Sequence, residues 1–311
     1  MTPTARTVLP TDLVALVSYD GRVYANQAMT RDRTGTEDSP HPLETAFEQW
    51  LSFATGRHTC VSVKGPTLRG LVSARRRGSK LAWEIDCLIN AAEGDGSVLT
   101  SLLDRITSAA GRSGGLRIFV RLAGGAEAAS AVARCAFVPY LEEDLLRRGV
   151  QPGEDLALPP GLRRRAKADL YPLFQLYNAI APAEVRRFEG LTFAEWNAGQ
   201  ENLGKTSHFV LERDGRLAGW LRVAGDGELG RFDVLGEHAS LDELIQAGMA
   251  KVANRKTACV LVPSYQEAVR LRLEALGFQR ASAYTTFARR TVHTVKAAKR
   301  VAPALVHTTF G

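Results

Sequence analysis

The sequence predicts an α/β chain of two similar halves, each with a mixed, mostly antiparallel central sheet flanked by helices. The chain has 311 residues, which is about twice the length of an average domain. The segment 149–161, GVQPGEDLALPPG, divides it, because two adjacent prolines exclude both a helix and a central strand. Strand-like and helix-like segments follow the same order on both sides of this break, namely β-α-α-β-β-β-α-β-α-β-β.

The first half begins with a short strand and then a helix that Thr11 or Asp12 would cap. Apolar residues at helical spacing predict a second helix over 41–56, which ends at Gly56. The segments that follow are predicted to be three strands, a helix, a buried strand, a helix and a closing pair that includes an edge strand, EEDLLRR. In order, these segments are HTCVSVKG (58–65), RGLVSARRRG (69–78), KLAWEIDCLI (80–89), SVLTSLLDRITSAAG (97–111), LRIFVRL (116–122), AEAASAVARC (126–135) and AFVPYLEEDLLRR (136–148).

The second half repeats this order. A strand and helix open it, a short helix begins near Pro182, and a hairpin turns at Asp214–Gly215. A third strand, an amphipathic helix, a buried strand, a helix and a closing pair complete it. In order, these segments are RRRAKADLYPLFQLYNAI (163–180), PAEVRRFEG (182–190), SHFVLERDGRLAGWLRVAG (207–225), ELGRFDVLG (228–236), SLDELIQAGMAKVANR (240–255), TACVLVPS (257–264), YQEAVRLRLEALG (265–277) and FQRASAYTTFARR (278–290).

Composition narrows the class of protein. No apolar run reaches 18 residues and no signal-peptide core is present, so we expect no membrane span and a cytoplasmic location. Four separated cysteines without a CxxC motif argue against disulfides and zinc, and no metal site is expected. The net charge of +7 is concentrated in ARRRGSK (74–80), LRRRAK (162–167) and VKAAKR (295–300). These clusters indicate either an anionic partner such as nucleic acid or ordinary solvated surfaces.

Two short motifs carry a family resemblance. AAEGDGSVLTSLL (91–103) places Gly94 and Gly96 before a helix, and VRLRLEALGF (269–278) ends a helix with Gly277 and Phe278. Together with the order of elements, they resemble the GNAT superfamily of N-acetyltransferases over residues 6–290. The resemblance implies two tandem GNAT-like domains, 1–150 and 161–290, joined by a linker at 151–160. A basic C-terminal tail would occupy 291–311.

The glycine loop indicates where a cofactor would bind. Gly94 and Gly96 allow positive φ and close ligand approach, and N–H groups at a helix N-terminus attract phosphate. The alternative is a plain connector with Ser97 as the N-cap. The resemblance implies an acetyl-CoA or other acyl-CoA site in the first half, formed by Leu88, Asn90, Gly94, Asp95, Gly96 and Ser97. Glu237 and His238 replace the glycines in the second half, so we expect one acyl-CoA per chain.

Acyl transfer to an amine requires a general base and a proton donor for the leaving thiolate. Glu84 and Asp86 alternate with apolar residues, which puts both carboxylates on one face of a strand, and they are the predicted catalytic bases. A solvated sheet face explains them equally. The tyrosine that donates the proton in the family is replaced by Leu273 in the second half and by Val132 in the first, which leaves Asp86 or Tyr140 as donors.

The resemblance also assigns the stretch 176–190, with Tyr177, Arg186, Arg187 and Glu189, to the acceptor region. We therefore expect an acyl-CoA-dependent N-acyltransferase that acts on an unidentified amine. The alternative is an inactive GNAT-derived protein that binds a partner, such as nucleic acid, through its basic surface. The sequence leaves open whether the halves pair with each other or in a homodimer.

Overall fold

A computed structural model describes residues 5–12, 14–16, 25–36, 56–92, 96–150, 157–201 and 203–291. The helix predicted over 41–56 lies outside these residues except at its last position, and so does most of the basic tail. None of the helices described combines the length and apolarity that crossing a bilayer requires.

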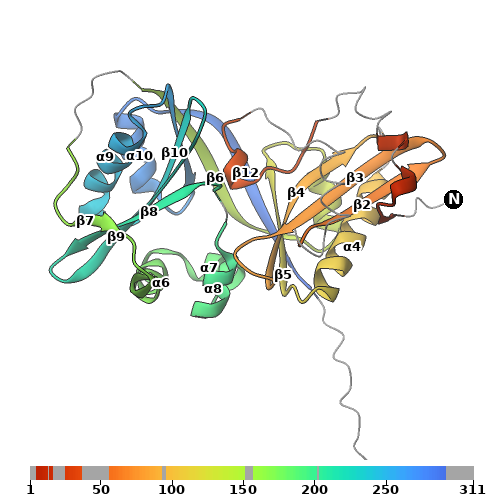
Figure 1. The fold of residues 1–311 in the computed structure, drawn as a ribbon, viewed down its shortest axis with the longest axis horizontal. Helices are drawn as coiled ribbons and strands as arrows, with labels where there is room; N and C mark the ends of the chain where they lie inside the picture. The colour runs from red at the N-terminus through yellow and green to blue at the C-terminus, as the bar shows by residue number, and fades with distance from the viewer. Residues whose placement is uncertain are drawn as a thin grey trace, which may run out of the picture.

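The part of the first half that the structure describes contains a long helix and a mainly antiparallel sheet with one parallel pair of strands (Figure 1). Its elements are β1 (Arg6–Thr7), η1 (Pro10–Asp12), η2 (Arg31–Arg33), β2 (His58–Lys64), β3 (Thr67–Arg76), β4 (Ala82–Asn90), α4 (Gly96–Arg112), β5 (Arg117–Ala123), α5 (Ala128–Arg134) and β6 (Val138–Gly149).

The second half repeats this order and adds a group of short helices. Its elements are β7 (Leu162–Arg164), η3 (Lys167–Asp169), α6 (Leu170–Ile180), α7 (Ala183–Glu189), α8 (Phe193–Gly199), β8 (Thr206–Arg213), β9 (Arg216–Asp226), β10 (Leu229–Gly236), η4 (His238–Ser240), α9 (Leu241–Val252), β11 (Thr257–Pro263), α10 (Glu267–Ala275) and β12 (Gln279–Arg290). The predicted hairpin is β8–β9, and both Asp214 and Gly215 adopt positive φ in its turn.

The twelve strands of the described residues form one sheet in the order β1-β2-β3-β4-β5-β12-β6-β11-β10-β9-β8-β7. Among these described strands, only β4–β5 and β10–β11 are parallel pairs, so the predicted fold class is confirmed. Each half ends in one long strand rather than the predicted pair. These strands are exchanged: β12 lies beside β5, and β6 lies beside β11, at the centre of Figure 1.

This exchange corrects the prediction that EEDLLRR is an edge strand, since β6 pairs with both β11 and β12. The two halves nevertheless keep separate apolar cores. Phe287 of β12 packs in the core under α4, and Leu146 of β6 packs in the core under α9. Each half therefore completes the core of the other.

A bulge in β4 changes the expected alternation of side chains. Ser73 of β3 pairs with Cys87 and Ala74 pairs with Ile85, which leaves Asp86 without an opposite residue. Trp83 and Ile85 consequently pack with α4, whereas Cys87 packs in a different apolar cluster.

Candidate active site

The two parallel strands of the second half separate and leave a wedge. β10 and β11 pair only at Leu229–Arg231 with Thr257–Cys259, and among the described residues no further ladder pair joins them. We call the space beyond Arg231 and Cys259 the C-terminal wedge. Ligand sites in α/β sheets occur where neighbouring strands part at their carboxyl ends.

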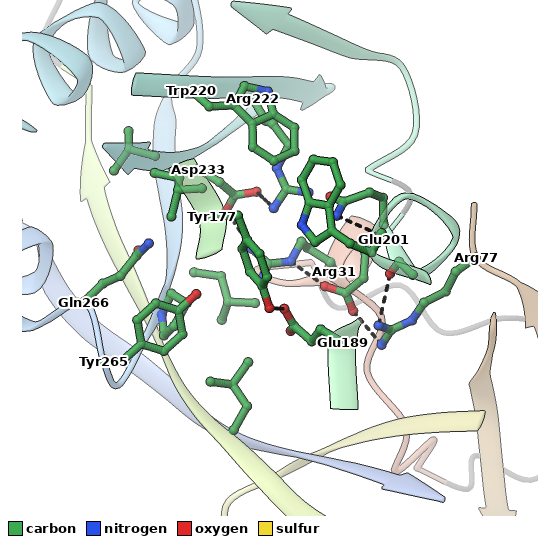
Figure 2. Close-up of a pocket in the computed structure, with 18 residues that line it drawn as sticks. Arg31, Arg77, Tyr177, Glu189, Glu201, Trp220, Arg222, Asp233, Tyr265 and Gln266 are labelled. Atoms are coloured by element: carbon green, nitrogen blue, oxygen red, sulfur yellow. Dashed lines mark hydrogen bonds and ion pairs between the residues drawn. The ribbon is translucent and has the colours of Figure 1, made fainter. Parts of the chain in front are cut away.

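A pocket opens at this wedge and is the candidate active site (Figure 2). Strands β10 and β11, the start of α10, helices α6–α8 and two arginines of the first half contribute to it. Its lining residues are Arg31, Arg77, Leu141, Tyr177, Glu189, Trp196, Gly199, Gln200, Glu201, Trp220, Arg222, Asp233, Val234, Leu235, Leu261, Pro263, Tyr265 and Gln266.

Three carboxylates line the pocket: Glu189, Glu201 and Asp233. Glu201 and Asp233 form ion pairs with Arg31, whereas Glu189 forms no ion pair with an arginine or lysine among the residues described. The hydroxyl of Tyr177 donates a hydrogen bond to its Oε2 at 2.7 Å, and Tyr140 donates to its Oε1 at 3.4 Å. Burial raises the pKa of Glu189, and this effect outweighs the hydrogen bond from Tyr177. A carboxylate with a raised pKa in a pocket is a candidate general base.

Tyr265 faces Glu189 and Tyr177 across the pocket in Figure 2. It lies between the end of β11 and the start of α10. Burial, followed by the charge of Glu189, raises its pKa, so the hydroxyl stays protonated at neutral pH. Tyr265 is therefore a candidate proton donor.

A network of buried ion pairs forms one wall. Arg31 Nε and Arg121 Nη2 donate to Glu201 at 2.6 and 2.8 Å, and Arg77 Nη2 donates to it at 3.1 Å. Burial opposes the charge of Glu201, but these three arginines outweigh it and hold its pKa well below the usual range. Asp233 lies 2.9 Å from Arg31 and 3.2 Å from Arg222. These acids are charge partners and not bases.

The chain places Glu189 through a tight junction of α7 and α8. Gly190 ends α7 with φ of +151°, and a Cβ there would lie 2.3 Å from the backbone nitrogen of Trp196. Thr192 and Glu195 then form a capping box that starts α8. Trp196 packs against Tyr177, with ring centroids 5.9 Å apart, so an aromatic cluster supports the hydroxyl that binds Glu189.

The predicted bases lie elsewhere. Glu84 is buried and paired with Arg75 at 2.7 Å and Arg77 at 3.3 Å. Asp86 is fully buried, with Arg57 Nη1 2.5 Å from its Oδ2. Neither lines the pocket. Both carboxylates are paired with arginines, but burial still raises the pKa of Glu84, so their role as catalytic bases stays a prediction.

The predicted cofactor residues are only partly described. Gly94 and Asp95 lie outside the described residues. Gly96 begins α4 without the positive φ expected of it, and a Cβ there would meet only the end of the Arg134 side chain. Ser97 follows in the first turn of α4, and the Oδ1 of Asn90 accepts a hydrogen bond from Ala92 N at 3.2 Å. The N–H and C=O groups of Leu88 are both hydrogen-bonded to residues 26 and 27.

The corresponding loop of the second half is closed by its own hydrogen bonds. The N–H of Ser240 donates to Glu237 O at 2.9 Å, and that of Leu241 donates to His238 O. Glu237 is exposed, and Asp242 and Glu243 lie in the first turn of α9. Carboxylates at this end of a helix oppose phosphate binding, and the expectation that this loop binds no acyl-CoA stays a prediction.

The first basic cluster is only partly exposed: Arg76 and Lys80 lie on the surface, whereas Arg75 and Arg77 point inward. Arg75 and Arg77 form the ion pairs with Glu84 described above, and Arg77 also stacks over the ring of Phe119 at 3.9 Å. In the second cluster, Arg163 pairs with Asp169 and Glu212. Lys296 and Arg300 lie outside the described residues. Binding of nucleic acid stays a prediction, with Arg75 and Arg77 removed from its surface.

Sequence reasoning named Tyr177, Glu189 and Tyr140 but missed Tyr265, Glu201 and Arg31. Tyr265 follows a buried strand by two residues, a position where functional side chains often lie in α/β sheets. Glu201 and Arg31 gave no local signal, since each depends on contacts with the other half. No group of three or more His, Cys, Asp or Glu side chains in the described part of the chain is arranged to hold a metal ion, and all four cysteines are buried thiols.

No protein-family model and no curated protein sequence matches the chain. Several solved structures do match it. A tandem GNAT protein from the clavulanic acid biosynthesis pathway gives a TM-score of 0.53 at 14% identity, covering 92% of this chain and 98% of that one. Saccharomyces cerevisiae N-myristoyltransferase with bound myristoyl-CoA gives 0.51 at 14% identity, with 93% and 84% covered.

A putative acetyltransferase from Pyrococcus horikoshii gives a TM-score of 0.51 at 10% identity, covering 94% of this chain and 90% of that one. These alignments extend over both halves and the exchanged strands between them. The chain therefore has the tandem GNAT fold.

Proposed function

We propose that the second half is an acyltransferase in which an acyl thioester lies in the C-terminal wedge and an amine acceptor approaches Glu189. The observation that carries this proposal is a carboxylate with a raised pKa, without an ion-pair partner among the described residues, where two parallel strands part. Supporting it, a protein of this fold, the yeast N-myristoyltransferase, has been solved with bound myristoyl-CoA. This moves the proposed site from the first half to the second.

The site suits the pantetheine arm of an acyl-CoA better than its diphosphate. The wedge between β10 and β11 suits an extended pantetheine arm, and the acyl thioester supplies an activated carbonyl carbon. The start of α9 offers the diphosphate little, because exposed Glu237 precedes it and the arginines beside it, Arg272 and Arg213, are already paired with Asp242 and Glu243. We therefore propose recognition through the pantetheine arm rather than the phosphates.

The side chains supply the proton transfers. The amine reacts in its neutral form: its nitrogen forms a bond to the thioester carbon, and the carboxylate of Glu189 takes one proton from that nitrogen as the amide forms. As the carbon–sulfur bond breaks, Tyr265 donates its proton to the leaving sulfur. The products are an amide and a free thiol, and exchange with solvent returns the proton from Glu189 to Tyr265.

The test is release of free thiol from acetyl-CoA in the presence of a panel of primary amines. We expect Glu189→Gln to slow release by about 10²–10⁴-fold, because it removes a general base. Tyr265→Phe should slow it while leaving acetyl-CoA affinity unchanged. Asp104→Asn, which removes a surface ion pair with Arg289, is the control and should match the wild type. A Glu189→Gln variant with the wild-type rate would contradict the assignment.

A binding protein without catalysis is the second candidate. The observation that favours it is that neither half combines an open wedge with a glycine loop: the first wedge holds residues 26–29, and the second lies beside an acidic helix start. Calorimetry with acetyl-CoA separates the two candidates. Binding of acetyl-CoA without thiol release by any amine would favour the second candidate.

A further inference from the structure

The first half contains a wedge of the same kind as the second. β4 and β5 pair only at Ala82–Glu84 with Arg117–Phe119, and among the described residues no further ladder pair joins them. Unlike the C-terminal wedge, this N-terminal wedge holds a stretch of the chain itself. We call residues 25–34 the strap.

The strap is hydrogen-bonded to β4 in the manner of an added strand. The N–H of Gln27 donates to Leu88 O at 2.9 Å, and the side-chain oxygen of Asn26 accepts from Leu88 N at 2.9 Å. Asn26 Nδ2 also donates to Asp86 O at 3.1 Å. Both main-chain groups of Leu88 are therefore used by the strap.

The other side of the strap is bonded to β5 and α5. Ala28 forms an antiparallel bridge with Leu122, and the N–H of Met29 donates to Arg121 O at 2.9 Å. Gln27 Oε1 accepts from Ala128 N, at the start of α5, at 2.7 Å. Ala28 is 2% exposed and belongs to the main core of the first half. The strap is thus an integral part of that core.

The strap continues directly into the candidate active site. After Met29 and Thr30, the chain turns into η2, and Arg31 enters the pocket of the second half (Figure 2). Its guanidinium lies 2.6 Å from Glu201, 2.9 Å from Asp233 and 2.7 Å from Glu143. Arg33 Nη1 donates to Asp86 O at 2.9 Å, which fixes the far end of the strap to β4. One short segment therefore contacts both wedges.

We propose that the strap is a built-in occupant of the N-terminal wedge and that it holds Arg31 in the C-terminal pocket as a positioning residue. Arg31 orients Glu201 and Asp233 and so shapes the pocket that Glu189 also lines. A ligand that entered the N-terminal wedge would have to displace residues 26–29 and would withdraw Arg31. The first half then has no independent ligand site and controls the second. The effect of Arg31 on catalysis rests on the proposed function, whereas the structural coupling between the strap and the C-terminal pocket does not.

Amide hydrogen exchange on the full chain tests the coupling without any ligand. Asn26→Ala removes two hydrogen bonds between the strap and β4, and we expect about tenfold faster exchange at 25–34. Exchange should rise in parallel at 199–201 and 231–234, which Arg31 holds. Arg31→Gln should raise exchange at the same second-half segments.

Asp12→Ala is the matched control, because it also removes side-chain hydrogen bonds from the N-terminal region, to Leu9 N and Arg6. It should change exchange at neither the strap nor the pocket. Faster exchange of the strap in Asn26→Ala without a change at 199–201 would overturn the coupling. Unchanged exchange of the strap would also overturn it. If Asn26→Ala does not fold, Gln27→Ala, which loses the contact with Ala128, gives the same comparison.

Titration with acetyl-CoA keeps this inference separate from the proposed function. One equivalent per wild-type chain supports both, and Arg31→Gln should then weaken binding or thiol release. Two equivalents would show that the N-terminal wedge is open and would overturn the strap. No binding would refute the proposed function, and hydrogen exchange would still decide the coupling.

Discussion

Glu189 and Glu201 line the same pocket and have opposite pKa shifts. Glu189 receives hydrogen bonds from tyrosine hydroxyls, and burial raises its pKa. Glu201 forms ion pairs with three arginines, and these hold its pKa well below the usual range. The two carboxylates are thereby divided into a group that can take up a proton and a group that neutralises charge.

This difference predicts opposite effects of pH on stability. The folded pKa of Glu189 lies above its unfolded value, so ionising it destabilises the fold as pH rises through that range. The folded pKa of Glu201 lies below, so its stabilisation is present above its unfolded pKa and is lost as pH falls. Urea unfolding of Glu189→Gln and Glu201→Gln between about pH 3 and 9 measures both effects, because the loss from Glu201 begins only below its unfolded pKa.

We expect Glu201→Gln to lower the unfolding free energy by about 3 kcal/mol near pH 7, because it leaves buried arginines unpaired. Glu189→Gln should be within about 1 kcal/mol of the wild type or more stable, with its advantage growing as pH rises. Equal losses in the two variants would contradict the different environments assigned to them.

Gly190 predicts a second, purely steric effect. In Gly190→Ala, the added methyl would lie 2.3 Å from Trp196 N and the residue would keep φ of +151°, so the α7–α8 junction must shift. Glu189 is its neighbour, so acetyl-CoA turnover should fall together with a stability loss of about 3 kcal/mol or more.

Gly204→Ala is the matched control for this prediction. Gly204 has φ of +77°, and a Cβ there would meet nothing within 4 Å. It carries only the backbone cost, of about 1 kcal/mol. Thermal melts of both variants separate crowding from φ strain, and similar melting temperatures would show that the contact with Trp196 is unimportant.

The elements of this fold were predictable because their signals are local. The β8–β9 hairpin follows from Asp214–Gly215, and α4 and α9 follow from apolar residues at helical spacing. The exchange of β6 and β12 could not be predicted from the sequence. Both strands are 12 residues long, and no local sequence signal indicates which strand each of them pairs with. Pairing partners far apart in the chain are a property of the assembled sheet.

Part of the candidate site was also predictable, because some of its residues lie close together in the sequence. Tyr177 and Glu189 share one helical hairpin and were named together, whereas Glu84 and Asp86, which were named as bases, do not line the pocket. A carboxylate on a strand looks the same in sequence whether or not an arginine lies opposite. Arg75 pairs with Glu84 across β3 and β4, and the ARRR run on the neighbouring strand was the available signal.

The interior position of Arg77 predicts how the first basic cluster behaves. Its side chain is 4% exposed and pairs with Glu84 and Glu201. Arg77→Gln should therefore lower the unfolding free energy by about 3 kcal/mol. Any binding of duplex DNA in a gel-shift series at low salt should be unaffected. A specific loss of DNA binding in a fully stable variant would return Arg77 to the surface interpretation.

The acidic start of α9 makes a prediction about the donor. If recognition depends on the wedge and not on phosphates, S-acetylpantetheine should bind within about tenfold of acetyl-CoA, a difference of about 1.4 kcal/mol. Replacing Glu237 and Asp242 by glutamine and asparagine removes negative charge near the helix N-terminus. These changes should tighten acetyl-CoA binding and leave S-acetylpantetheine unchanged. Calorimetry with both ligands checks this, and a preference for acetyl-CoA of a thousandfold or more in the wild type would show that a phosphate site exists elsewhere.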